Sequence, residues 1–228
     1  MSNHNQISDV FSQPYPAAPR NIGLIIIDMQ HDFCGPTGWV AQLGENPANT
    51  AAMIAPIQRL LHACRAAGVT VIHTREGHLP DLSDLPANKQ WRTRQHGLGI
   101  GDRGKTGRVL VRGEPGWQIV EELRPLDGEI VIDKPGKSSF HRTDLDARLR
   151  QLQISHLLIC GVTSDCCVQA TMRDAADRDF HCALVVDCTA AVETPNHQAA
   201  LAILAADGGR WGKSVTAEQA MYAVQELR

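Results

Sequence analysis

The chain lacks the features that mark membrane, exported and nucleic-acid-binding proteins. No apolar run is long enough to span a bilayer, and residues 1–20 show no basic-then-apolar signal pattern. Basic blocks are absent and the formal net charge is −3, which argues against nucleic acid or an anionic membrane as the main partner. The sequence also has no internal repeat, no low-complexity tract and no linker to a second domain. We therefore expect a cytoplasmic protein with a polar arm over 1–20 and a single domain over 21–228.

The chain also lacks an even number of cysteines, which complete disulfide pairing within one chain would need. The chain has seven, so complete internal pairing is excluded, and without an export signal we expect reduced thiols. What is present suits one medium-sized globular domain, because 228 residues with 43% hydrophobic and 21% charged side chains can bury a full core.

Short apolar runs alternate with amphipathic stretches along the chain. The runs predict strands buried in a parallel sheet, at 21–27, 69–74, 130–133, 157–160 and 183–187. The stretches between and after them predict helices, starting at Pro56, capped by Thr143, following Gly161, and covering 197–206 and 216–227, the last with a Thr216–Gln219 capping box. This alternation predicts an α/β fold with a doubly wound, mainly parallel sheet flanked by helices.

The segment 75–108 breaks this alternation. It is long, rich in glycine, proline and charge, and has little periodicity. A loop of this length in a compact domain is usually functional or part of a subunit interface, and we expect one of these two roles.

The stretch from Gly161 to Thr171 leads from a strand through a tight turn into a helix with two adjacent cysteines in its first turn, Cys166 and Cys167. Unpaired backbone N–H groups and the positive end of the helix dipole favour a thiolate there. The same N–H groups suit an oxyanion that forms during a reaction.

Ligands of such sheets bind beyond the carboxyl ends of the strands, where Asp28 and Lys134 join Cys166 or Cys167. Asp28 would take the thiol proton and hand it to a leaving amine, while Lys134 would favour both anions. Taken singly, Asp28 is as often a helix or turn cap as a catalyst, whereas a solvated lysine and a core cysteine are more frequent than catalytic ones. Their convergence on one edge favours a covalent hydrolase.

Three ordered motifs carry a resemblance to a known family: 25–33 (IIIDMQHDF), 134–140 (KPGKSSF) and 161–173 (GVTSDCCVQATMR). From about residue 21 onward the chain resembles the isochorismatase-like cysteine hydrolases. The resemblance implies a six-stranded, three-layer sandwich and a catalytic triad of Asp28, Lys134 and Cys167, with Cys166 as a packing residue. It also implies a cis peptide before Thr163 and an oxyanion hole formed by Thr163 and Cys167.

Within this family the chain looks similar to the biuret hydrolase and related ureide amidohydrolases, on the segments 72–78 (IHTREGH), 84–89 (DLPANK) and 112–117 (RGEPGW). This implies a small ureide substrate, biuret or triuret, whose terminal carbamoyl group is hydrolysed with release of ammonia. Lys137 would bind a carbonyl or carboxylate end and Phe33 would form an apolar wall, although a solvated lysine and a core phenylalanine fit equally. Asp207 accepts hydrogen bonds and would favour an N–H-rich ureide such as triuret; the alternative is a polar helix end.

Other functions fit the same residues. An N-carbamoyl amino acid or ureidoacrylate-type amidohydrolase of the same family is one, and a non-catalytic thiol redox or partner-binding module is another. Nicotinamidases of the superfamily bind a metal, but here Glu76 and His78 are followed by Leu82 at the third ligand position, so we expect no metal and no cofactor. Glu76 and His78 would shape the pocket or an interface. The resemblance and the segment 75–108 also suggest a homo-oligomer, with a tetramer as the expected state.

Overall fold

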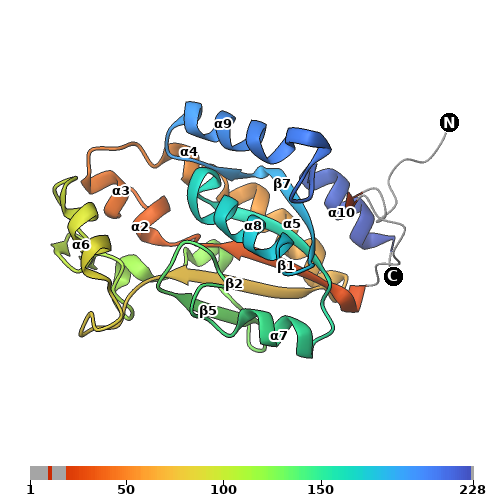
Figure 1. Cartoon of the computed structure of the whole chain (residues 1–228), viewed down its shortest axis with the longest axis horizontal. Helices are drawn as coiled ribbons and strands as arrows, with labels where there is room; N and C mark the ends of the chain where they lie inside the picture. The colour runs from red at the N-terminus through yellow and green to blue at the C-terminus, as the bar shows by residue number, and fades with distance from the viewer. Residues whose placement is uncertain (1–9, 12–18, 227–228) are drawn as a thin grey trace.

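A computed structural model describes residues 10–11 and 19–226 of the chain (Figure 1). Its centre is a six-stranded sheet in the order β5-β2-β1-β6-β7-β8, in which every neighbouring pair is parallel. The strands are β1 (Ile22–Ile27), β2 (Thr70–Glu76), β5 (Ile130–Lys134), β6 (His156–Val162), β7 (His181–Ala190) and β8 (Lys213–Val215). The expected doubly wound α/β fold with a six-stranded parallel sheet is confirmed.

Helices cover both faces of this sheet and complete the three layers (Figure 1). One face carries α5 (Ile54–Ala66) and α10 (Ala217–Gln225), which pack together, and the other carries α7 (Leu145–Gln151), α8 (Gln169–Ala176) and α9 (Thr194–Ala205). The short elements are η1 (Pro19–Asn21), α2 (His31–Cys34), α3 (Trp39–Gln42), α4 (Ala48–Ala51), α6 (Ala87–Arg94), β3 (Arg103–Gly104), β4 (Gly107–Arg108), η2 (Pro115–Trp117), η3 (Glu121–Leu123), the π-helical turn η4 (Ser164–Val168) and η5 (Ala206–Gly208).

The central strands are buried on both faces, as their continuous apolar runs predict. In β1, Leu24 and Ile26 join the core cluster on one face, while Ile25 and Ile27 join the cluster on the other. This alternation follows from the two-residue repeat of a strand. The strand therefore has no solvated face, and the first polar side chain follows directly after its last residue.

Two helix ends show how closely the caps follow the sequence. The Thr216 hydroxyl accepts a hydrogen bond from the backbone N–H of Gln219, and the capping box expected there is present. The cap expected at Thr143 is displaced, because α7 begins at Leu145 with Asp144 at the cap position. The Thr143 hydroxyl still accepts a long hydrogen bond, 3.4 Å, from the Leu145 N–H, and it donates to the carbonyl oxygen of Ser139 at 2.6 Å, which ties the helix to the preceding loop.

The polar N-terminal arm is partly docked. Val10 and Phe11 are 3% and 4% exposed, and the Phe11 ring packs edge-on against His156 at 4.8 Å between centroids. The expectation of a polar arm over 1–20 is wrong for these two residues, whose apolar side chains join the core; 1–9 and 12–18 lie outside the described residues. Over the described part of the chain, no helix combines the length and apolar character needed to cross a membrane.

Candidate active site

Asp28, Lys134 and Cys167 converge at the carboxyl edge of the sheet. Asp28 follows β1, Lys134 is the last residue of β5, and Cys167 lies in η4 after β6. The Nζ atom of Lys134 is 2.7 Å from Oδ2 of Asp28, and both side chains are fully buried. Cys167 is only 4% exposed. A carboxylate, an ammonium group and a thiol therefore share one enclosed site.

The turn that presents Cys167 has the geometry that the sequence suggested. Gly161 has a φ of +105°, and a Cβ atom there would overlap the backbone of Ile27 in the neighbouring strand. The peptide between Val162 and Thr163 is cis, as the family resemblance implied. The Thr163 carbonyl oxygen then accepts hydrogen bonds from two N–H groups of η4, which starts the helix under Cys167.

Asp28 is held in an unusual backbone conformation. Its φ is +50°, a region that residues other than glycine rarely occupy and that concentrates at functional sites. Its backbone N–H donates to the carbonyl oxygen of Thr74 at 3.2 Å, and the Thr74 hydroxyl donates to Oδ1 of Asp28 at 2.7 Å. With Oδ2 facing Lys134, both oxygens of the carboxylate have a partner. The strand end therefore fixes the orientation of this carboxylate.

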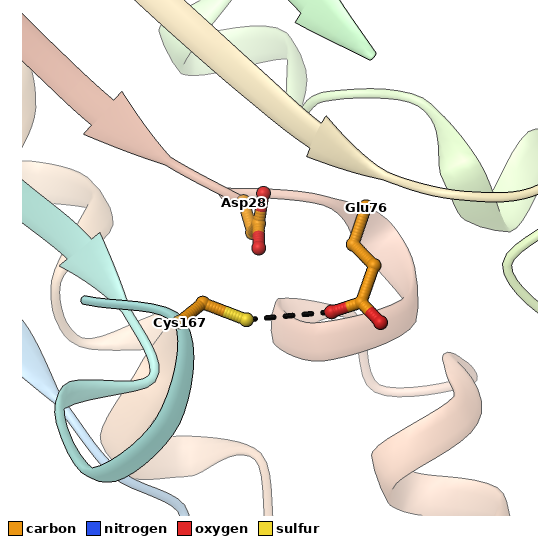
Figure 2. A group of neighbouring side chains, drawn as sticks. All are labelled: Asp28, Glu76 and Cys167. Carbon is orange, nitrogen blue, oxygen red and sulfur yellow. Dashed lines mark hydrogen bonds between the residues drawn. The ribbon is translucent and has the colours of Figure 1, made fainter. Parts of the chain in front are cut away.

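Glu76 lies at the centre of the site. It is the last residue of β2 and is fully buried. The Sγ atom of Cys167 donates to Oε2 of Glu76 at 3.3 Å, and Figure 2 shows the two side chains pointing at each other with Asp28 beside them. The sequence predicts Glu76 at the pocket or at an interface, and the structure places it beside Cys167 and Lys137 in the buried site. Its position at the end of a strand is the sequence feature that indicates this place, because Glu76 pairs in register with Lys134 at the end of the neighbouring strand.

Three lysines surround the Glu76 carboxylate. Oε1 lies 2.7 Å from Nζ of Lys89 and 3.0 Å from Nζ of Lys137, and Oε2 lies 4.0 Å from Nζ of Lys134. Lys89 also donates to the carbonyl oxygen of Pro135 at 2.7 Å. Lys89 comes from α6 in the long segment between β2 and β5, which sequence reasoning assigned a functional role without singling out this lysine. It bridges that segment to the loop after β5.

The charges in the site stabilise one another against burial. Burial opposes ionisation of Glu76, but the ammonium groups of Lys137, Lys134 and Lys89 outweigh it and lower the pKa of Glu76. Burial also acts against the charge of Lys134, yet Asp28 and the other anions raise the pKa of Lys134. The pKa of Lys137 is raised against burial in the same way, chiefly by Glu76. Glu76, Lys134 and Lys137 therefore stabilise one another's charges, whereas burial lowers the pKa of Lys89 despite the opposing effect of Glu76.

Cys167 differs from the expectation based on the helix start. A hydrogen bond with Cys166, burial, and the charges of Asp28 and Glu76 raise the pKa of Cys167 well above its ordinary value. The same hydrogen bond, with help from Lys137, lowers the pKa of Cys166. The hydrogen bond with Cys166 and burial, more than the two carboxylates, keep the thiol of Cys167 protonated in the resting site. It needs a base before it can attack.

A second layer of polar side chains holds Glu76 in place. The Gln30 side-chain amide donates to the carbonyl oxygens of Glu76 at 3.0 Å and Trp117 at 2.9 Å, and accepts from the Glu76 N–H at 2.8 Å. His78 contacts Lys89 at 3.0 Å through Nε2 and Asp84 at 3.2 Å through Nδ1. Burial and Lys89 lower the pKa of His78, so its neutral ring can accept from the lysine.

The expected substrate-binding residues fall in three different places. Lys137 contacts Glu76 in the site. Phe33 is 8% exposed and packs in the core with its ring 6.3 Å from that of Trp39, which matches the core alternative. Asp207 is exposed and paired with Arg210 at the end of α9. Because α9 runs back across the sheet, Asp207 lies at the opposite, amino edge, and the structure does not bring it to Cys167.

The acidic cluster does not suit a metal ion. Asp28, Glu76 and Cys167 each offer one ligand atom, and these atoms lie within 4.8 Å of one another. However, Lys134 already contacts Asp28, and Lys137 contacts Glu76, so ammonium groups supply the positive charge. A cation would have to displace them against strong repulsion.

Comparison with known proteins places this site in a family. A sequence model of the isochorismatase domain matches residues 23–218. The ureidoacrylate amidohydrolase RutB of Serratia proteamaculans (strain 568) is 32% identical over 183 residues, covering 75% of this chain and 71% of that protein. The RutB of Methylobacterium radiotolerans is 30% identical over 220 residues, covering 93% and 84%. Both relatives are named as ureidoacrylate amidohydrolases, which supports the amidohydrolase prediction and favours the ureidoacrylate-type alternative over biuret hydrolase.

Solved structures agree on the fold. A cysteine hydrolase from Pseudomonas syringae pv. phaseolicola 1448A superposes with a TM-score of 0.78 at 27% identity, covering 95% of this chain and 100% of that one. An N-carbamoylsarcosine amidase from Thermoplasma acidophilum shares the fold with a TM-score of 0.65 at 23% identity, covering 87% and 97%. With the match over residues 23–218, these similarities show that the chain belongs to the isochorismatase family.

Proposed function

We propose that the protein is an amidohydrolase that cleaves the terminal carbamoyl C–N bond of a small ureido acid through a thioester on Cys167. The observation that carries this proposal is the buried pairing of Asp28 with Lys134 at 2.7 Å beside a neutral thiol. A neutral thiol needs a base, and a charge-stabilised carboxylate next to it can act as one.

The reaction follows from these positions. As Sγ of Cys167 bonds to the carbamoyl carbon, its proton passes to Asp28, while Lys134 stays charged throughout. We assign stabilisation of the oxyanion to the backbone N–H groups of Thr163 and Cys167. When the C–N bond breaks, Asp28 returns the proton to the leaving nitrogen. Water then cleaves the thioester by the same route and frees the thiol.

The charge of the site favours an acid as substrate. Three ammonium groups (Lys89, Lys134, Lys137) face two carboxylates (Asp28, Glu76), so one positive charge is left over when the thiol is neutral. A substrate carboxylate would balance it. Lys137 has the most exposed side chain of the three lysines, at 43%, and we assign it to that carboxylate. The ureidoacrylate amidohydrolases among the relatives support the same class.

Biuret and triuret are the second candidate. The observation in their favour is that Glu76 places a hydrogen-bond acceptor 3.3 Å from the nucleophile, where the N–H groups of an uncharged ureide could donate. Both classes share the same bond cleavage at Cys167. They differ in what Lys137 binds.

A substrate panel tests the proposal. Purified wild type is assayed with N-carbamoyl-β-alanine, ureidoacrylate, biuret and triuret, and ammonia is measured, since carbamate released from a ureido acid decomposes to ammonia. We expect turnover of at least one ureido acid, and a loss of at least about 1,000-fold in kcat for Cys167→Ser. Cys166→Ser is the matched control and should stay within about threefold of wild type.

Two outcomes would contradict the proposal. If wild type releases no ammonia from any of the four compounds above a buffer control, the ureide assignment fails. If Cys166→Ser is inactive and Cys167→Ser is not, the nucleophile is misassigned. The homotetramer stays a prediction that light scattering on the same preparation can measure.

A further inference from the structure

The resting thiol points at the carboxylate that the mechanism leaves unused. Cys167 donates to Oε2 of Glu76 at 3.3 Å, whereas the two oxygens of Asp28 face Thr74 and Lys134, each at 2.7 Å. The thiol proton is thus directed toward Glu76 rather than toward the base. It must turn before Asp28 can accept it.

Glu76 is built to accept hydrogen bonds rather than to accept protons. The three surrounding lysines keep its pKa low, so it stays ionised beside the thiol. Gln30 fixes its backbone on both sides, and the side chain is fully buried. A fixed anion with one oxygen facing the nucleophile is a strong acceptor for any N–H group that enters the site.

We propose that Glu76 holds the Cys167 thiol in the resting site, and that an N–H group of the substrate replaces the thiol at Oε2 and turns its proton toward Asp28. The exchange links binding of a ureide to activation of the nucleophile. It rests on the proposed function for the identity of the substrate. The holding contact itself is a property of the free protein.

One variant should change the two measurable quantities in opposite directions: the reactivity of the Cys167 thiol should rise and the turnover of substrate should fall. Glu76→Gln keeps the shape of the side chain but removes the negative charge that raises the pKa of Cys167. The thiol should then ionise more easily, while the substrate loses its charged acceptor. General damage to the site would lower both alkylation and turnover.

Alkylation of Cys167 by iodoacetamide measures the first half without any substrate. Glu76→Gln is made in the Cys166→Ser background, so that mass spectrometry follows one thiol of the pair, and its rate is compared with that of Cys166→Ser alone, because the Cys166 hydrogen bond affects the pKa of Cys167. We expect Glu76→Gln to react at least about tenfold faster at pH 7.5, with its pH profile moved to lower pH by about one unit or more. Turnover of N-carbamoyl-β-alanine should fall about 100-fold in kcat.

The matched control is Glu129→Gln, the same substitution at the other carboxylate bound beside β2. It should leave the alkylation rate of Cys167 unchanged. Equal acceleration in both variants would show loosening of the fold and would overturn the proposal, as would an unchanged or slower rate in Glu76→Gln. Retained turnover in Glu76→Gln would overturn the substrate half.

A second substitution keeps the proposal testable if Glu76→Gln fails to fold. Glu76→Asp retains the charge but withdraws the oxygen from Cys167, so alkylation should accelerate less than in Glu76→Gln while kcat falls more than about tenfold; full turnover would overturn the proposal. Failure of the proposed function is distinguishable, because faster alkylation in Glu76→Gln supports the holding contact even if no ureide is hydrolysed.

Discussion

Glu76 and Glu129 are both cation-bound carboxylates beside strand β2, and the difference between their partners separates chemistry from structure. Glu129 accepts from Nε and Nη2 of Arg65 at 2.7 and 2.9 Å, from the Leu126 N–H at 2.9 Å, and lies 3.1 Å from Nε2 of His73. A fixed arginine fork and a backbone donor saturate it. Glu76 is bound instead by the separate ammonium groups of Lys89 and Lys137 and by the Cys167 thiol, with no two-pronged arginine fork.

Both carboxylates are held ionised, so ionisation alone does not identify the functional one. Burial acts against the charge of Glu129, but the hydrogen bonds from Arg65, Leu126 and His73 lower its pKa to about 2. What distinguishes Glu76 is a nucleophile within hydrogen-bonding distance. We infer that a functional carboxylate is one whose hydrogen-bond donor can be replaced by a ligand.

Lys134→Met should have the largest effect at the carboxyl edge. It leaves Asp28 buried without its ammonium partner, which should lower the free energy of unfolding by about 3–5 kcal/mol and reduce kcat by about 1,000-fold. Urea denaturation and ammonia release measure the two effects. Full activity in the variant would contradict the proposed role of Lys134 in the reaction. Full stability would contradict the need of the buried Asp28 carboxylate for an ammonium partner.

Glu129→Gln should lose stability without losing activity. The folded pKa of Glu129 is about 2, below its ordinary value of 4.5, so its stabilisation is present above about pH 4.5 and disappears as the pH falls toward 2. We expect a loss of about 2 kcal/mol at pH 7 that shrinks below pH 5. Denaturation of wild type and variant across this range checks it; a constant difference would contradict the assignment.

Asp207→Asn should have the smallest effect. The side chain is 62% exposed and pairs with Arg210 at the amino edge. Stability should change by less than about 0.5 kcal/mol, and kinetic constants for biuret, triuret and N-carbamoyl-β-alanine should stay within about twofold. A selective change for triuret would restore the role that sequence reasoning gave to Asp207.

The sheet and the triad positions could be predicted because local sequence encodes them. A buried strand is a continuous apolar run, and the residue after it lies at the carboxyl edge, which is how Asp28 and Lys134 were found. β8 was missed because it is three residues long with one buried side chain, Val215. A strand this short has no periodicity to detect.

The rest of the site depends on contacts that no local pattern encodes. Lys89 reaches Glu76 from a short helix in a segment with little periodicity, so only the folded chain shows the pair. Asp207 failed for the opposite reason. The local sequence shows that Asp207 lies at the end of a helix. Which edge of the sheet that helix end reaches depends on the direction of α9, which the local sequence does not give.

The origin of Lys89 has an evolutionary consequence. Asp28 and Cys167 lie in the turns that directly follow β1 and β6, whereas this lysine belongs to α6, in the long segment between β2 and β5. A single codon change to a neutral residue at position 89 would leave two ammonium groups facing two carboxylates, and the site would carry no excess charge. Under the proposed function, substitutions in the segment between β2 and β5 would shift the preference from acidic to uncharged substrates without any change at Asp28, Lys134 or Cys167.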